Sequence, residues 1–234
     1  MCGITGILSI KNKTQNIFSE LYESLFHLQH RGQDSAGFAV YNEEIKIYKK
    51  TGLINQFKTI LDNTKGFCGI GHIRYSTNNL KKYSKNVQIQ PVVYKKKYEC
   101  YICHNGQINL TDTVKQYCNT HNISMDNCFT DSILFTRIFC YNLEMLPELS
   151  KQAVCKVIEH ICSFLDGAFS IICIIKDFGF ICFKDNNGIR PLSYGYKNNT
   201  LLVSSESVAL SSQNYEHIKE LYPDEILISV FKEH

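Results

Sequence analysis

The residues at the start of the chain could supply a nucleophile and its base together. Met1 is followed by Cys2, and removal of Met1 would leave a cysteine that carries both a thiol and a free α-amine. An α-amine has a reference pKa of about 7.7–8.0, so a part of it is neutral at physiological pH and can accept the thiol proton, directly or through one water. The alternative is that Cys2 is an ordinary small residue. Whether it is a nucleophile depends on whether the chain also contains residues that could bind and polarise a substrate.

Further polar residues lie where strands are expected to end or helices to begin. Arg74 ends an apolar stretch, where it could form a bidentate pair with a carboxylate or a structural ion pair. Asn105 and Gly106 follow another apolar stretch. An Asn amide and the next backbone N–H can converge on one oxygen, as in an oxyanion hole, although an Asn-Gly pair also makes plain turns. Asp131 starts an expected helix, which it could cap, or it could bind an ammonium group.

Together these side chains describe a site for a small zwitterion that carries an amide. Arg74 would bind an α-carboxylate and Asp131 an α-ammonium. Cys2 would attack the side-chain carbonyl, and Asn105 with Gly106 would hold the oxyanion that forms. Free glutamine has this shape.

The elements that must position these residues follow from hydrophobic periodicity. The short turns between strands favour largely antiparallel sheets, and strands, then helices, then strands indicate a layered α/β architecture. We expect a hairpin turn at Lys95 to Lys97, an N-cap at Ser150, and helix ends near Gly32 and Gly167. The expected helices cover residues 18–28, 131–141 and 151–165. The expected strands cover residues 3–10, 36–41, 45–48, 67–74, 89–94, 98–103, 168–175, 178–183, 192–196, 200–204 and 225–230.

Composition limits the class of protein. The chain has 234 residues, 44% of them hydrophobic, which suffices for one large domain or two small ones with a sizeable core. A net charge of +3 is too small to argue for nucleic acid. No apolar stretch approaches the ~20 residues of a membrane span, and we expect no signal peptide. The eleven cysteines lie mostly in apolar runs, which predicts reduced thiols in a cytoplasmic protein.

Cys100 and Cys103 have the spacing of a CxxC motif. They fall in an expected strand, where side chains three residues apart point to opposite faces and clamp a metal poorly. A second CxxC that would complete a zinc set is absent from the sequence. We therefore expect neither a metal nor a redox centre at this pair.

The order of the short motifs resembles the class II glutamine amidotransferases, which are N-terminal-nucleophile hydrolases. In their order and their residues the motifs look most like those of the glutaminase domain of the amidophosphoribosyltransferase family. The match runs from Met1 to about Val230. The motifs that carry the resemblance are Met1-Cys2-Gly3-Ile4, His30-Arg31-Gly32-Gln33-Asp34-Ser35-Ala36-Gly37, Gly71-His72-Ile73-Arg74-Tyr75-Ser76-Thr77, His104-Asn105-Gly106, Thr130-Asp131-Ser132, Asp166-Gly167-Ala168-Phe169-Ser170, Gly188-Ile189-Arg190-Pro191-Leu192 and Ser205-Glu206-Ser207-Val208-Ala209-Leu210.

The resemblance implies a fold and a set of roles. The fold is the four-layer αββα sandwich of two largely antiparallel sheets, with no metal and no cofactor. Gly188, Arg190 and Glu206 are expected to be structural or interfacial. The implied roles are the nucleophile for Cys2, the oxyanion hole for Asn105 and Gly106, glutamine binding for Arg74 and Asp131 with help from Thr77 at the carboxylate, and support of the nucleophile for Arg31 and Gly32.

Two departures from the family pattern shape the expectations on organisation. Residues 1–234 are expected to form a single glutaminase domain, with the family's phosphoribosyltransferase domain absent, because no apolar strand ending in paired acidic residues occurs. Residues 78–88 are rich in Lys and Asn, where relatives carry small residues in a segment that closes over glutamine. We therefore expect residues 75–88 to form a lid that is mobile in the free chain.

The sequence leaves three functions open. The first is hydrolysis of glutamine to glutamate and ammonia for amidophosphoribosyltransferase-type purine synthesis, with a phosphoribosyltransferase or other synthase as partner. The second is a glutaminase subunit for another ammonia acceptor. The third is a catalytically idle glutamine-binding or regulatory domain, which the intact set of Cys2, Arg74, Asn105, Gly106 and Asp131 argues against. No contact with nucleic acid or membrane is expected, and a homo-oligomer is compatible with the sequence.

Overall fold

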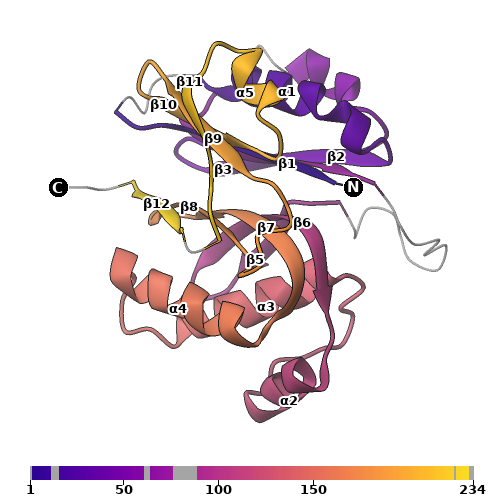
Figure 1. Ribbon diagram of the computed structural model, residues 1–234, viewed down its shortest axis with the longest axis vertical. Helices are drawn as coiled ribbons and strands as arrows, with labels where there is room; N and C mark the ends of the chain where they lie inside the picture. The colour runs from indigo at the N-terminus through magenta and orange to yellow at the C-terminus, as the bar shows by residue number, and fades with distance from the viewer. Residues whose placement is uncertain (1, 12–15, 61–63, 76–88, 224, 232–234) are drawn as a thin grey trace.

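Two antiparallel sheets form the centre of the molecule (Figure 1). The computed structural model describes residues 2–11, 16–60, 64–75, 89–223 and 225–231. Within them, the seven-stranded sheet has the order β11-β9-β10-β1-β4-β2-β3, and the five-stranded sheet has the order β12-β8-β7-β6-β5. The large sheet contains β1 (Gly3–Ser9), β2 (Ser35–Tyr41), β3 (Ile45–Thr51), β4 (Cys68–Arg74), β9 (Ser193–Lys197), β10 (Thr200–Ser204) and β11 (Glu216–Glu220). The small sheet contains β5 (Val92–Lys95), β6 (Glu99–Asn109), β7 (Asp166–Ile175), β8 (Gly179–Lys184) and β12 (Leu227–Val230).

Helices cover the outer face of each sheet, so the molecule has four layers (Figure 1). Helices α1 (Phe18–His27) and α5 (Val208–Ser211) lie on the large sheet. Helices α3 (Asp131–Glu144) and α4 (Lys151–Phe164) lie on the small sheet, with α2 (Asp112–Thr120) beyond them. The predicted αββα sandwich is confirmed, and so is the antiparallel pairing of its strands.

Three hydrophobic cores separate the four layers. One lies between α1 and the large sheet, one between the two sheets, and one between the small sheet and its helices. Strand β1 contributes to two of them, because Ile4 and Leu8 face the small sheet while Ile7 faces α1. These three side chains are at most 2% exposed, and burying one of this size stabilises the fold by roughly 1.5–3 kcal/mol.

The two sheets approach closely where β1 crosses the small sheet. A Cβ on Gly6 would lie 2.7 Å from ring atoms of Phe180 and 2.7 Å from a methyl group of Ile172. Both neighbours belong to the core between the sheets. Glycine at this position therefore lets the Phe180 ring lie directly against the backbone of β1.

The CxxC pair lies where the sequence predicts. The hairpin between β5 and β6 pairs Lys95 with Glu99, which confirms the expected turn. Cys100 packs in the core beneath the helices of the small sheet, whereas Cys103 packs between the two sheets. The two thiols therefore lie on opposite faces of β6, as the alternation of a strand requires.

Several elements differ from the sequence prediction. Ser150 is the N-cap of α4, as expected, and its hydroxyl accepts the Ala153 N–H at 3.2 Å. Gly167, however, lies inside β7, and α4 ends before it. Strand β6 continues six residues past the predicted end at Cys103. Elements α2, α5 and β11 were not predicted from the sequence.

Within the described residues, none of the helices is long and apolar enough to cross a membrane.

The core between the sheets should dominate stability. Phe180 is fully buried there, so Phe180→Ala is expected to lower the free energy of unfolding by about 3–5 kcal/mol. Phe26 on α1 is 51% exposed, so Phe26→Ala should change it by less than about 0.5 kcal/mol. Urea unfolding followed by circular dichroism measures both. Equal losses in the two variants would contradict this account of the core.

Candidate active site

Cys2 lies immediately before β1. Alternation along the strand places it on the same side as Ile4, which faces the small sheet. Its Sγ lies 3.8 Å from the carbonyl oxygen of Tyr75, the residue that follows β4. Burial raises the pKa of the Cys2 thiol, and the backbone of Tyr75 and the charge of Arg74 only partly offset this. The thiol is therefore protonated at neutral pH and needs a base to become a nucleophile.

Arg31 holds the main chain of Cys2. Its Nε donates to the Cys2 carbonyl oxygen at 2.8 Å, and its Nη1 lies 2.5 Å from a carboxylate oxygen of Glu206. Arg31 is the last residue of a 3₁₀ turn, Gln29–Arg31, which follows α1. The structure thus places Arg31 beside the predicted nucleophile, and its supporting role stays a prediction.

Gly32 packs against the end of β4. A Cβ at this position would lie 2.5 Å from both the carbonyl carbon and oxygen of Arg74. Gly32 is the C-cap of the Gln29–Arg31 turn, and its N–H donates to the Gln29 carbonyl, which confirms the expected helix end near Gly32. Its backbone is extended, with φ at −169°. Its small size is what matters, because it lets the turn after α1 approach the strand end that leads to Tyr75.

Asn105 and Gly106 lie within β6 and not in a turn after it, so the alternative of a plain Asn-Gly turn is wrong. Alternation places Asn105 on the same face as Tyr101 and Cys103, toward the large sheet. Asn105 is 1% exposed, and within the described residues its Nδ2 has no hydrogen-bond partner. A buried donor without an acceptor costs about 1–3 kcal/mol, which is typical of a group that waits for a ligand.

The backbone at Gly106 accepts only glycine. Its φ is +144°, and a Cβ would lie 2.0 Å from the carbonyl oxygen of Ala168 on β7. Gly167 on β7 has the same φ, and its Cβ would lie 2.2 Å from the carbonyl oxygen of Gln107. The two glycines therefore let β6 and β7 approach unusually closely at this point of the sheet.

Asp131 binds the backbone of β6. Its Oδ2 accepts the Ile108 N–H at 3.0 Å and its Oδ1 accepts the Ser132 N–H at 2.9 Å. The N-cap of α3 is Thr130, whose hydroxyl accepts the Ile133 N–H at 3.3 Å. The interpretation of Asp131 as a helix cap is therefore wrong. Its carboxylate is held at a set position, and 29% of the side chain stays exposed.

A buried network of hydrogen bonds joins Ser132, the residue after Asp131, to His104 and Gln90. The Ser132 hydroxyl lies 2.8 Å from Nδ1 of His104 and accepts from the Gln90 amide at 3.1 Å. The Gln90 side-chain oxygen accepts the His104 N–H at 2.7 Å. Sequence reasoning missed Gln90 and Ser132 in this role, because no local pattern shows that residue 90 reaches α3.

Two of the predicted glutamine-binding residues, Arg74 and Asp131, interact electrostatically with the thiol. The charge of Arg74 lowers the pKa of Cys2 and that of Asp131 raises it, so both groups lie within electrostatic reach of the sulfur. Arg74 is the last residue of β4, and Asp131 is the first residue of α3. Asn105 lies on β6 between His104 and Ile108, which both contact the Asp131 region. Thr77 lies outside the described residues, and so does all of the predicted lid, residues 75–88, except Tyr75.

His72 is an ionisable group that the sequence reasoning left without a role. It lies two residues before Arg74 on β4, so the two share the face toward the small sheet. The side chain is fully buried, and within the described residues both ring nitrogens lack a hydrogen-bond partner. Burial is the largest cause that lowers the pKa of His72 to about 3, and the positive charge of Arg74 acts in the same direction.

A thiol at the start of a central strand, inside an αββα sandwich, defines the class of N-terminal-nucleophile hydrolases. The model for the family described as "Glutamine amidotransferase domain" matches residues 77–212, more than half of the chain. The chain belongs to this family of glutamine amidotransferases.

Similar proteins point to one branch of the family. The amidophosphoribosyltransferase of Saccharomyces cerevisiae is 31% identical over 97% of this chain and 46% of its own length. The amidophosphoribosyltransferase of Methanocaldococcus jannaschii is 32% identical over 97% of this chain and 46% of its own length. The solved glutamine phosphoribosylpyrophosphate amidotransferase of B. subtilis, in complex with ADP and GMP, aligns with a TM-score of 0.78 and 26% identity, covering 97% of this chain and 47% of that one. The chain thus spans about half the length of these relatives.

The buried, neutral His72 predicts a loss of stability in acid. In the unfolded chain a histidine has a pKa near 6.5, whereas that of His72 in the fold is about 3. Between these values the unfolded state binds more protons, so stability falls by about 1.4 kcal/mol per pH unit as the pH is lowered. From pH 7 to pH 5 the contribution of His72 is a loss of about 2 kcal/mol.

The comparison uses two histidine variants. Urea unfolding at pH 7 and pH 5 should show a loss smaller by about 2 kcal/mol in His72→Gln than in the wild type. His217→Asn is the control, since His217 lies exposed on β11, and it should keep the wild-type pH dependence. An unchanged pH dependence in His72→Gln would contradict the burial of a neutral imidazole.

Proposed function

We propose that this domain hydrolyses glutamine to glutamate and ammonia through a thioester on Cys2. The observation that carries the proposal is the buried Nδ2 of Asn105, which has no hydrogen-bond partner among the described residues and lies on the face of β6 toward the large sheet. It is a hydrogen-bond donor that a developing oxyanion would satisfy. Membership of the glutamine amidotransferase family supports the choice of substrate.

The proposed reaction begins with the α-amine of Cys2 after removal of Met1. The amine takes the thiol proton, and the thiolate attacks the side-chain carbonyl carbon of glutamine. The negative charge moves to the carbonyl oxygen, where the Asn105 amide and the Gly106 N–H stabilise it. The ammonium then returns its proton to the leaving nitrogen, and ammonia departs. Water, deprotonated by the same amine, hydrolyses the thioester and releases glutamate with the thiol restored.

The two ends of glutamine are assigned to one residue on β4 and one on α3. Arg74 would bind the α-carboxylate through its two-pronged guanidinium. Asp131 would bind the α-ammonium, since each of its oxygens has a lone pair beyond the bond that it accepts from the backbone. Thr77 is proposed to assist at the carboxylate, and Arg31 with Gly32 to support the nucleophile.

The ammonia acceptor is proposed from the relatives. They are named amidophosphoribosyltransferases, and this chain spans about half of their length. We propose that residues 1–234 act as one glutaminase domain whose ammonia serves a phosphoribosyl-transfer reaction of purine synthesis. Ammonia release from glutamine alone, and its stimulation by a phosphoribosyltransferase partner, would test the two halves of the proposal separately.

The free α-amine of Cys2 should be essential. A fusion with a factor Xa site directly before Cys2 keeps this amine in a peptide bond until cleavage exposes it. Cleavage is expected to raise the rate of ammonia release by about 10²–10⁴-fold, the usual contribution of a positioned base. Cys2→Ser, cleaved in the same way, should show background rates only. Intact mass verifies each N-terminus, and full activity of the uncleaved fusion would contradict the mechanism.

Substrate binding and turnover should separate by residue. Arg74→Lys and Asp131→Asn are expected to raise the KM for glutamine, because each weakens a charge contact with one end of the substrate. Asn105→Ala should instead lower kcat by about 10²–10³-fold, as with other oxyanion donors.

A matched arginine variant controls for general damage. Arg137 donates through Nη1 to the carbonyls of Ser124 and Asp126, so Arg137→Lys loses a two-carbonyl contact that is unconnected with Cys2. Its glutamine kinetics, measured as initial rates of ammonia release, should match those of the wild type. An unchanged KM in Arg74→Lys would contradict glutamine binding by Arg74 and would favour the alternative of a structural ion pair.

A further inference from the structure

We propose that Glu206 is a positioning residue for the nucleophile and acts through Arg31. The sequence motif around Glu206 indicated a structural or interfacial residue, whereas the structure connects it to Cys2 in two steps. Glu206 pairs with Arg31 at 2.5 Å, and Arg31 donates to the Cys2 carbonyl oxygen at 2.8 Å. The inference rests on the proposed function, because it concerns the placing of the thiol that attacks glutamine.

The segment after β10 holds the start of β1 at two points. The ladder between β1 and β10 ends at the pair Thr5 and Ser204. Beyond it, the Ile4 N–H donates to the Ser205 hydroxyl at 3.0 Å, and the Ser205 N–H donates to the Ile4 carbonyl at 2.9 Å. Glu206 follows directly and reaches Cys2 through Arg31. Residues 205 and 206 therefore hold the start of β1 beyond the last paired residues of β1 and β10.

The charges in this chain of contacts are matched. The Arg31 side chain is 5% exposed and the Glu206 side chain is 29% exposed. Burial raises the pKa of Glu206, but hydrogen bonds from Arg31 and His30 outweigh it and lower the pKa overall. The carboxylate is thus ionised at neutral pH and compensates a nearly buried guanidinium. Without it, Arg31 would be a buried charge with no counter-ion and would move toward water.

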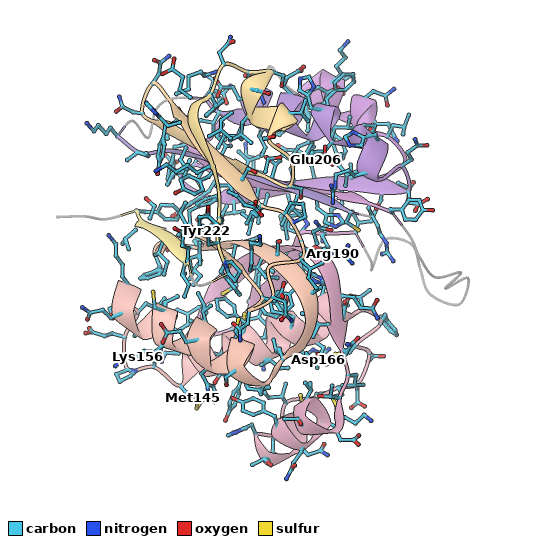
Figure 2. The ribbon with its side chains drawn as sticks, in the orientation of Figure 1. Met145, Lys156, Asp166, Arg190, Glu206 and Tyr222 are labelled. Carbon is cyan, nitrogen blue, oxygen red and sulfur yellow. The ribbon has the colours of Figure 1, made fainter. Side chains whose placement is uncertain are left out.

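The geometry predicts an effect on turnover and not on binding. The contacts that the structure records for the Glu206 side chain are with Arg31 and His30, and neither is among the proposed glutamine-binding residues. Figure 2 shows Glu206 beside the large sheet, in the half of the molecule away from α3. Release of the Cys2 carbonyl would leave the thiol attached but misplaced, and a displacement of about 1 Å can lower a rate about 10²-fold.

The test measures glutamine kinetics of two Glu206 variants with free Cys2. Glu206→Ala is expected to lower kcat about 10²-fold and to leave KM within about two-fold of the wild type, because the binding groups are untouched. Glu206→Gln keeps an oxygen acceptor for Arg31 and should lose less activity. This variant preserves size, so it decides the question if Glu206→Ala fails to fold.

A double-variant cycle separates positioning from general stability. If Glu206 acts through Arg31, the double variant Arg31→Gln, Glu206→Gln should be no slower than Arg31→Gln alone. The matched control is Glu220→Gln, which breaks another pair between a buried cation and a part-exposed carboxylate, Lys184 with Glu220 at 3.1 Å. It should lower the melting temperature and leave kcat unchanged.

The outcomes distinguish this inference from the function on which it rests. Wild-type kcat in both folded Glu206 variants, additive losses in the double variant, or an equal loss in Glu220→Gln would each overturn the positioning role alone. Absence of ammonia release from wild-type protein with a verified free Cys2 would refute the proposed function and this inference with it.

Discussion

The placing of Cys2 depends on the burial of β1 on both faces. Ile4 and Leu8 pack between the sheets, and Ile7 packs under α1. A slip of one residue along β1 would exchange these faces and put a side chain where Gly6 now lies against Phe180 and Ile172. The register is therefore strongly determined, and the residue that precedes the strand inherits a defined position. A nucleophile at the start of a peripheral strand would lack this restraint.

The candidate site joins the two sheets. Cys2 and Arg74 belong to the large sheet, whereas Asn105 belongs to the small sheet and Asp131 to the helix that covers it. The core between the sheets thus holds the two halves of the site at a set distance. Asp131 adds to this, because its bond to the Ile108 N–H ties α3 to β6. Charge and hydrogen-bond donors are in place in the folded chain, and such preorganisation would stabilise the oxyanion of the proposed reaction.

The sequence predicts the elements that bury apolar side chains and misses those that do not. Strand β11 has exposed side chains along its whole length, so it shows no alternation of buried and exposed residues. Helix α5 has four residues, too few for a helical period to show. Helix α2 buries only Val114 and Cys118, so its amphipathic stripe is short. The predicted end of β6 at Cys103 is too early because polar residues follow, although the first two of them, His104 and Asn105, are buried as deeply as the apolar ones.

The same reasoning explains what could be foreseen of the site. The types of Cys2, Arg74, Asn105 and Asp131 indicate their chemistry, and alternation along β4 would have put His72 on the face of Arg74. The contact between Arg31 and Glu206 spans 175 residues of sequence, and no periodicity reports it. This pairing depends on the register of β1 with β10, which places Glu206, and on the turn after α1, which places Arg31. The local sequence thus predicts which chemical groups a site contains, whereas the contacts that orient these groups depend on how the folded sheet brings distant segments together.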